Sequence, residues 1–148
     1  MVSKKIIAIA VVVIAVVAVV GVFIWQSMSA SFADVEIAIK SFLSALNNYD
    51  VDASWASMSP ELQLSYNSKG DFNSSILDGY KQAGWQATMA GASSKSVEIV
   101  NGVSTARFVV TLHITETGVS AYDDTYTFKL IKIGDQWKIN DWLQGEWD

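Results

Sequence analysis

The sequence of 148 residues contains no cysteine, one proline and one histidine. The lack of cysteine excludes a disulfide-stapled miniprotein and a lipoprotein acylated on cysteine, because each depends on a thiol. A single histidine without cysteine gives no zinc-ligand pattern, and no spacing of acidic residues matches a calcium loop. Glycine-rich phosphate loops and the common hydrolase and metalloprotease motifs are absent as well. We therefore expect neither a metal nor another cofactor.

Charged residues are scarce and unevenly placed. They make up 17% of the chain, with ten basic residues against fifteen acidic ones. Two of the ten, Lys4 and Lys5, lie at the N-terminus, so residues 26–148 carry eight basic and fifteen acidic side chains, a net charge of −7. An acidic domain without a basic patch repels nucleic acid, and we expect no nucleic-acid partner.

The longest hydrophobic run, residues 6–25, has no charged side chain and ends at Trp25. Twenty helical residues span about 30 Å, which is the thickness of the hydrocarbon core of a bilayer. The positive-inside rule, applied to Lys4 and Lys5, predicts a cytoplasmic tail at residues 1–5 and an extracytoplasmic remainder. Lys4, Lys5 and the interfacial Trp25 are the predicted anchor residues of a transmembrane helix at 6–25.

Two other interpretations of this segment stay open. Residues 31–33, Ser-Phe-Ala, resemble a signal-peptidase site, although the apolar run exceeds the usual length of about 7–15 residues in a signal peptide. A pilin-like subunit would also begin with an apolar helix, but such sequences usually carry a processing site before it, and residues 1–5 show none.

The first half of the remaining chain has helical periodicity. Apolar residues at three- and four-residue spacing predict a helix over 34–48, with Asp34 as its N-cap. A second helix-start signal is Ser59 followed by Pro60. Asp71 is expected to open a longer helix that fades over residues 84–90.

The second half changes to the two-residue period of strands. Residues 26–33 are small and polar and form a linker, so that 34–148 is one domain. Four strands joined by short turns are predicted at 94–100, 103–115, 121–133 and about 136–143, the first turn being Asn101-Gly102. Helices followed by strands predict an α+β fold, with three helices packed on a curved four-stranded antiparallel sheet.

The order of elements resembles the cystatin-like α+β roll of the nuclear transport factor two and SnoaL-like superfamily. The resemblance is carried by the runs VEIAIKSFLSALNNYDVDASWASMSPEL, VSTARFVVTLHI and YTFKLIKIGDQWKIND and covers residues 34–145. It is typical of membrane-anchored exported prokaryotic proteins of unknown function. It implies a cone-shaped roll, but this fold hosts enzymes, binders and scaffolds, so the activity does not follow.

The resemblance further implies that an enzyme of this kind would hold a proton-carrying Asp or His inside the cone. By strand alternation, Asp124 shares a face with Tyr122, Tyr126 and Phe128, whereas Asp141 shares one with Trp137 and Ile139. Asp124 and Asp141 are therefore the weak candidates for a general base. The candidate pocket residues are Tyr122, Tyr126, Phe128, Trp137 and Phe108. His113 falls on the opposite face from Phe108 and is expected to be exposed.

The outer face of the sheet offers another surface. In the superfamily this face commonly mediates dimerisation, and Thr125, Thr127, Lys129 and Ile131 are expected on it. Trp142 and Trp147 do not fit the inner stripe, so they either dock a partner, a glycan or the membrane interface, or belong to a C-terminal tail that covers the outer face. Asn73 begins an N-glycosylation sequon.

These observations predict a single-pass, membrane-anchored extracytoplasmic binding or scaffold domain without catalysis. Its partners would be the lipid bilayer through residues 6–25 and an envelope protein, a second copy or a small apolar ligand. One alternative is a pocket enzyme of the isomerase or dehydratase kind, which a cone filled by aromatic side chains would argue against. The other is the scaffold subunit of a secretion or conjugation machine, which has the same order of tail, span and roll.

Overall fold

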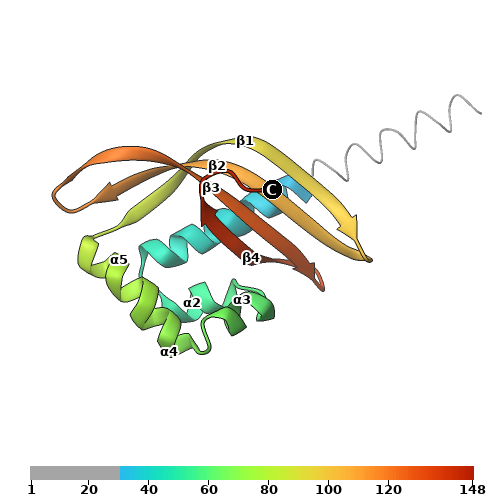
Figure 1. Cartoon of the computed structure of the whole chain (residues 1–148), viewed down its shortest axis with the longest axis horizontal. Coiled ribbons are helices and arrows are strands. Elements are labelled where there is room, and N and C mark those ends of the chain that lie inside the picture. Colours follow the sequence, from blue (N-terminus) through green and yellow to red (C-terminus); the bar gives the residue numbers. More distant parts are fainter. Residues whose placement is uncertain (1–30) are drawn as a thin grey trace, which may run out of the picture.

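The computed structural model describes residues 31–148, in which helices pack on one face of an antiparallel sheet (Figure 1). The predicted α+β class is therefore confirmed for this part of the chain. Within these residues, no helix is both long and apolar enough to cross a bilayer. The predicted span at 6–25, with Lys4, Lys5 and Trp25, lies outside the described residues.

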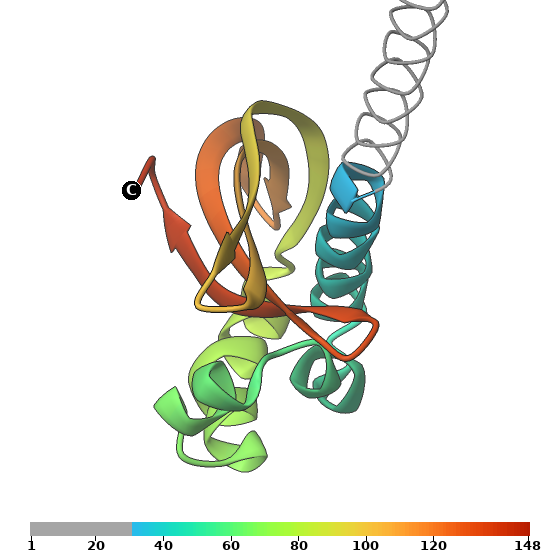
Figure 2. The same ribbon diagram turned by 90° about the vertical axis from the view of Figure 1, so that its right-hand side faces the viewer.

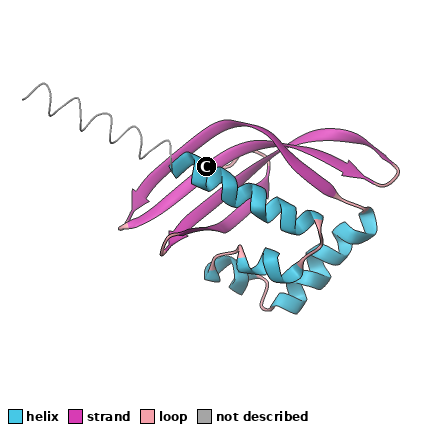
Figure 3. Cartoon of the chain, turned by 180° about the vertical axis from the view of Figure 1, so that it is seen from behind, coloured by secondary structure: helices cyan, strands magenta, loops and turns pink. Residues whose placement is uncertain are grey.

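The first helix, here called the long helix, covers residues 31–47 and lies along the concave side of the sheet (Figure 3). Its predicted apolar stripe faces inward: Val35, Ile39, Phe42 and Leu46 are all buried. The prediction of an N-cap at Asp34 is wrong, because residues 31–33 are already helical.

Short helical segments follow the long helix. They are α2 (Val51–Ala56), α3 (Pro60–Ser65), α4 (Lys69–Phe72), the π-helical η1 (Asn73–Leu77) and α5 (Asp78–Ala83). The predicted start at Ser59-Pro60 is confirmed, since the Ser59 side chain accepts a hydrogen bond from the backbone N–H of Leu62. The next helix begins earlier than expected, because Ser68 rather than Asp71 is its N-cap.

The sheet is an antiparallel meander in the order β1-β2-β3-β4. Its strands are β1 (Gln86–Val100), β2 (Val103–Glu116), β3 (Val119–Ile133) and β4 (Gln136–Gln144). The first strand begins at Gln86, so the prediction of a fading helix at 84–90 and a strand from 94 is wrong. Two register shifts in β1, at 89–91 and 92–94, interrupt the alternation that marks a strand. Figure 2 shows the strong curvature that encloses the cone, the space between the helices and the concave face of the sheet.

Both edges of the sheet are tied to the helical layer. At the β1 edge, the Asn47 side chain donates to Ala87 O and accepts from Ala87 N, each at 2.8 Å. At the β4 edge, Ser59 N donates to Ile139 O at 2.8 Å and Ile139 N donates to Ser57 O at 2.9 Å. The helices are therefore held against the sheet by backbone pairing as well as by the core.

An ion pair adds a further link between the long helix and β1. Lys40 and Lys95 both donate to the carboxylate of Glu36, at 2.7 Å and 3.3 Å. These two hydrogen bonds, that of Lys40 first, lower the pKa of Glu36 below its ordinary value of 4.5.

Candidate functional site

The cone is filled by the protein's own side chains. Phe42, Phe108 and Phe128 are 0% exposed, and the ring of Trp142 lies 5.3 Å from that of Phe42 and 6.5 Å from that of Phe128. Trp137 is buried in the same hydrophobic cluster. Two of the predicted pocket residues, Phe108 and Phe128, are thus packed core rather than the lining of an open cavity, whereas Trp137 also borders a cavity at the β3–β4 turn.

Asp124, the first candidate base, lies on β3 between the two remaining predicted pocket residues, Tyr122 and Tyr126. Asp124 pairs with the buried Leu112 and so lies on the inner face, as strand alternation predicts. Its carboxylate is already engaged, because Gln144 Nε2 donates to it at 2.5 Å and Thr125 N at 2.8 Å. The structure therefore gives Asp124 the role of a hydrogen-bond acceptor within the sheet.

Two tyrosines flank Asp124 along β3. The Tyr122 hydroxyl donates to Glu116 at 2.6 Å, and this bond raises the pKa of Tyr122 to about 12. Burial, followed by the negative charge of Asp124, raises the pKa of Tyr126. Both hydroxyls therefore keep their protons at neutral pH, and that of Tyr122 is a hydrogen-bond donor.

The prediction that Asp141 faces the cone is wrong. Lys129 pairs with Asp141 and Leu130 pairs with Ile139, so Asn140 is an extra residue in β4, a β-bulge. The bulge moves Asp141 to the outer face beside Lys129. It also moves Trp142 to the inner face, opposite Phe128, although alternation from Trp137 places it outside.

Residues 145–148, here called the C-terminal segment, lie across part of the outer face of the sheet. Gly145 N donates to Thr125 O at 2.7 Å, and the Thr127 hydroxyl donates to Gly145 O at 2.8 Å and accepts from Trp147 N at 3.1 Å. Thr127 is consequently 0% exposed. The expectation of a tail that covers this face is confirmed, while Trp147 itself remains 53% exposed.

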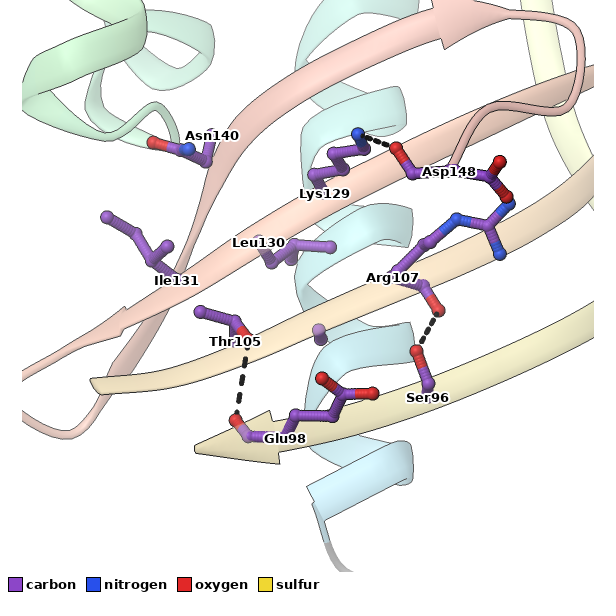
Figure 4. Close-up of a pocket in the computed structure, with 10 residues that line it drawn as sticks. Ser96, Glu98, Thr105, Arg107, Lys129, Leu130, Ile131, Asn140 and Asp148 are labelled. Atoms are coloured by element: carbon purple, nitrogen blue, oxygen red, sulfur yellow. Dashed lines mark hydrogen bonds between the residues drawn. The ribbon is translucent and has the colours of Figure 1, made fainter. Parts of the chain in front are cut away.

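A groove with two cationic side chains continues from the C-terminal segment, as Figure 4 shows. Arg107 and Lys129 are direct neighbours across β2 and β3. Arg107 Nε donates to the main-chain oxygen of Trp147, and Lys129 Nζ to that of Asp148. Beyond Asp148 lies a cavity of about 520 Å³, which we call the outer groove. It is lined in part by Ser96, Glu98, Thr105, Ile131 and Asn140.

Two further cavities lie where the long helix meets the sheet. One, of about 280 Å³, is lined by Leu43, Asn47 and Met89 among others. The other, of about 550 Å³, lies between the long helix and the β3–β4 turn and is lined by residues such as Ile37 and Lys138. The second lining also contains Asp34, Asp135 and Lys138, and neither lining includes Asp124 or Asp141.

The other predicted positions are surface features. His113 is exposed, as expected, and its Nδ1 lies 2.7 Å from Asp123 Oδ1 on the neighbouring strand. Asn73 is the first residue of η1 and is partly buried. Among residues 31–148, no group of three or more histidine, aspartate or glutamate side chains is placed to hold a metal ion.

Known proteins match this chain in fold, but the family models and the curated sequences do not match it. No protein-family model matches the sequence, and no curated protein matches it either. An NTF-2-like protein of unknown function from Shewanella oneidensis superimposes with a TM-score of 0.58 at 16% identity, over 77% of this chain and 98% of its own. The domain has the NTF2-like fold. The predicted resemblance to this superfamily is therefore confirmed at the level of the fold.

Two other solved structures are similar to this chain at comparable TM-scores. A candidate scytalone dehydratase from Novosphingobium aromaticivorans has a TM-score of 0.56 at 12% identity, over 82% of this chain and 88% of its own. A protein of unknown function from Mycobacterium tuberculosis has a TM-score of 0.58 at 10% identity, over 81% of this chain and 73% of its own. At such identities the NTF2-like fold is shared, and catalytic status does not follow from it.

Proposed function

We propose that this chain is a single-pass membrane protein that presents a non-catalytic binding domain of NTF2-like fold outside the cytoplasm. The observation that carries the proposal is the filled cone. Phe42, Phe108, Phe128 and Trp142 occupy the space in which a substrate of a pocket enzyme would sit. Recognition is then left to the outer surface, where the groove beside Arg107 and Lys129 provides room for a partner.

The membrane location in this proposal is supported by the sequence alone. Residues 6–25 are apolar throughout, and Lys4 and Lys5 precede them, as the positive-inside rule requires of a cytoplasmic N-terminus. After residue 25 the net charge is −7, so no excess of basic residues on that side opposes this orientation.

A pocket enzyme of the dehydratase kind is the rival function, and the likeness to the candidate scytalone dehydratase favours it. In its favour, Asp124 lies on the inner face near Tyr126. Against it, the Asp124 carboxylate already accepts hydrogen bonds from Gln144 and Thr125. Asp141, the second candidate base, points away from the cone beside Lys129.

The topology is tested by cysteine labelling, for which a chain without cysteine is a clean background. Ser120→Cys places a thiol on an exposed position of β3, and Ser3→Cys places one in the predicted cytoplasmic tail. We expect a membrane-impermeant maleimide to label only Ser120→Cys on intact spheroplasts and both variants after lysis. Labelling of Ser3→Cys before lysis would show that the orientation is the opposite of the one proposed. Release of the protein when membranes are washed would show that it has no transmembrane anchor.

The filled cone is tested by ligand-induced stabilisation of the full chain in nanodiscs. Benzene and larger apolar fragments are expected to leave the thermal midpoint unchanged, because no vacant site accepts them. The Leu112→Ala variant is the matched control, since truncating this buried side chain opens a cavity that benzene can fill. Stabilisation of the unmodified chain by such ligands would favour the pocket enzyme instead.

A further inference from the structure

We propose that the β1–β2 turn is a membrane-docking site, at which the exposed side chains of Ile99, Val100 and Val103 contact the lipid surface beside the predicted anchor. This inference rests on the proposed function, because it requires residues 6–25 to span the bilayer. It gives the domain a defined orientation on the membrane. The ligand is the apolar boundary between the lipid headgroups and the acyl chains.

The first argument is the composition of the turn. Ile99 is 76% exposed, Val100 47% and Val103 42%. Residues 99–104 read Ile-Val-Asn-Gly-Val-Ser and carry no charge. Polar side chains would serve a hairpin in water equally well, whereas aliphatic side chains that project from a turn gain free energy only when an apolar surface covers them. We call Ile99, Val100 and Val103 the apolar turn.

The path of the long helix places the apolar turn at the end of the domain where the helix begins. Near the end of the helix, Asn47 binds the backbone of Ala87 at the start of β1. Earlier in the helix, Glu36 binds Lys95 further along β1. The helix and β1 therefore run in opposite directions. Figure 1 shows the result: the β1–β2 and β3–β4 turns lie at the end of the sheet where the long helix starts, and the β2–β3 turn lies at the other end.

The apolar turn also projects past the start of the helix. From Glu36 back to residue 31 the helix rises about 7.5 Å, a length that about two strand residues cover. Because Glu36 lies beside Lys95, the start of the helix is level with Val97 on β1. The end of β1 at Val100 therefore reaches about 10 Å beyond it.

The chain between the predicted span and the long helix is short. Residues 31–33 are helical, so only residues 26–30 separate the helix from Trp25. Fully extended, the chain from residue 25 to residue 31 covers about 20 Å. Since the apolar turn projects about 10 Å past the helix, a linker that covers about half of its maximum length brings the turn to the headgroups.

The charges at this end of the domain favour an apolar contact over an electrostatic one. Glu98 and Asp135, next to the two turns, offset Lys95 and Lys132, so there is no excess of positive charge to attract anionic headgroups. Ile133, beside the β3–β4 turn, adds another exposed aliphatic side chain. A few such side chains bind a membrane weakly, but the anchor would hold them near it at an effective concentration in the millimolar range. Docking is therefore expected on uncharged lipid.

The experiment measures the depth of a fluorescent label on the full chain in phosphatidylcholine nanodiscs. Because the chain has no cysteine, Ser104→Cys near the start of β2 accepts one nitrobenzoxadiazole label beside the apolar turn. Ser120→Cys carries the same label next to the β2–β3 turn, at the opposite end of the sheet. We expect lipids with a nitroxide high on the acyl chain to lower the emission from Ser104→Cys at least twofold and to leave that from Ser120→Cys unchanged.

Conservative substitutions test whether the apolar side chains make the contact. Ile99→Thr, Val100→Thr and Val103→Thr together keep the β-branched shape that suits a strand and add a hydroxyl at each position. Because all three positions are exposed, the domain should stay folded, and we expect the quenching at Ser104→Cys to fall by at least half. Val119→Thr is the matched control, since this valine is 55% exposed at the opposite end of the sheet, and it should leave the quenching unchanged.

The possible results separate this inference from the proposed function. A chain that stays in the nanodisc without quenching at Ser104→Cys, or with quenching that the threonine variant does not reduce, would overturn membrane docking and leave the anchor standing. Blue-shifted emission from Ser104→Cys that nitroxide lipids do not quench would show that protein covers the turn, and would overturn docking in favour of a second copy. A chain that does not enter nanodiscs would overturn both the anchor and the docking.

Discussion

Replacing Trp142 with alanine tests the placement that most changes the character of the cone. If Trp142 lay on the outer face, as alternation from Trp137 predicts, its loss would cost about 0.5 kcal/mol or less, as for most surface substitutions. In the structure its ring instead meets three aromatic rings at an edge or in a stack. These are Phe42 at 5.3 Å, Tyr80 at 6.3 Å and Phe128 at 6.5 Å between centroids.

The size of the effect follows from this environment. Truncation of a fully buried tryptophan to alanine costs about 3–5 kcal/mol, and each aromatic pair contributes about 0.5–1.5 kcal/mol beyond burial. Trp142 is partly rather than fully buried, so we expect the lower end of that range, about 3 kcal/mol. A domain with a stability of about 5–15 kcal/mol remains folded after such a loss.

The assay is urea unfolding of the full chain in nanodiscs, followed by far-ultraviolet circular dichroism so that the lost indole does not change the signal. With an m-value of about 1.5 kcal/mol per molar, a loss of about 3 kcal/mol lowers the midpoint by about 2 M. Trp147→Ala removes the same atoms from a side chain that is 53% exposed and is expected to cost under about 1 kcal/mol. Equal midpoints for Trp142→Ala and Trp147→Ala would refute the inner placement.

Three further predictions concern single contacts. Gly84→Ala is expected to cost about 2 kcal/mol in the same urea titration, because φ is +63° and a Cβ would lie 2.3 Å from Thr117 Oγ1; Thr117→Ala should recover about half of that loss. Glu116→Ala removes the acceptor of the Tyr122 hydroxyl, so the pKa of Tyr122 should fall from about 12 toward 10 in an ultraviolet titration, and an unchanged curve would contradict the hydrogen bond. The lowered pKa of Glu36 stabilises the folded state above pH 4.5, and this contribution disappears as the pH falls through the lowered value. Glu36→Gln should therefore cost under about 1 kcal/mol at pH 7 and nothing at the acid end, as shown by unfolding at several pH values.

Signals that act between near neighbours in the chain were sufficient to predict much of the fold. Ser59 before Pro60 starts a helix because its hydroxyl accepts from an N–H three residues on, and that contact needs no tertiary information. Asn101-Gly102 forms the predicted hairpin turn because both residues adopt positive φ angles, 51° and 79°. The order of helices and strands, and with it the NTF2-like fold, follows from such local signals and from the change of hydrophobic period.

The beginning of β1 was not predictable in the same way. Residues 86–94 are mostly small or polar, and two register shifts break their alternation, so neither a helical nor a strand period stands out. What makes them a strand is pairing with β2 and the side chain of Asn47, which binds both backbone groups of Ala87 across 40 positions of sequence. Such a partner is visible only when the chain is folded.

The structure places the candidate site residues on other faces of the sheet than predicted, for a similar reason. One residue, Asn140, explains most of this difference. Regular alternation along β4 predicts that Asp141 faces the cone and Trp142 faces outward. The bulge at Asn140 reverses these two orientations. No local motif marks this bulge, because it is supported by Ser59, whose hydroxyl donates to Asn140 Oδ1 at 2.7 Å from 81 positions away. The exchange takes a candidate base out of the cone and puts an indole in its place.

The same exchange has a consequence on the other side of the sheet. Because Asp141 lies on the outer face, it is the cross-strand neighbour of Lys129, which in turn neighbours Arg107. Lys129 and Arg107 both donate hydrogen bonds to main-chain oxygens of the C-terminal segment. Deleting Asn140 should leave both faces in place, because Ile139 and Asp141 then become neighbours and ordinary alternation puts Asp141 outside and Trp142 inside. We expect this deletion to destabilise the domain less than Trp142→Ala does, because it removes the contact with Ser59 and keeps the aromatic contacts of Trp142. A deletion variant that is less stable than Trp142→Ala would show that the extra residue does not decide which face carries each side chain.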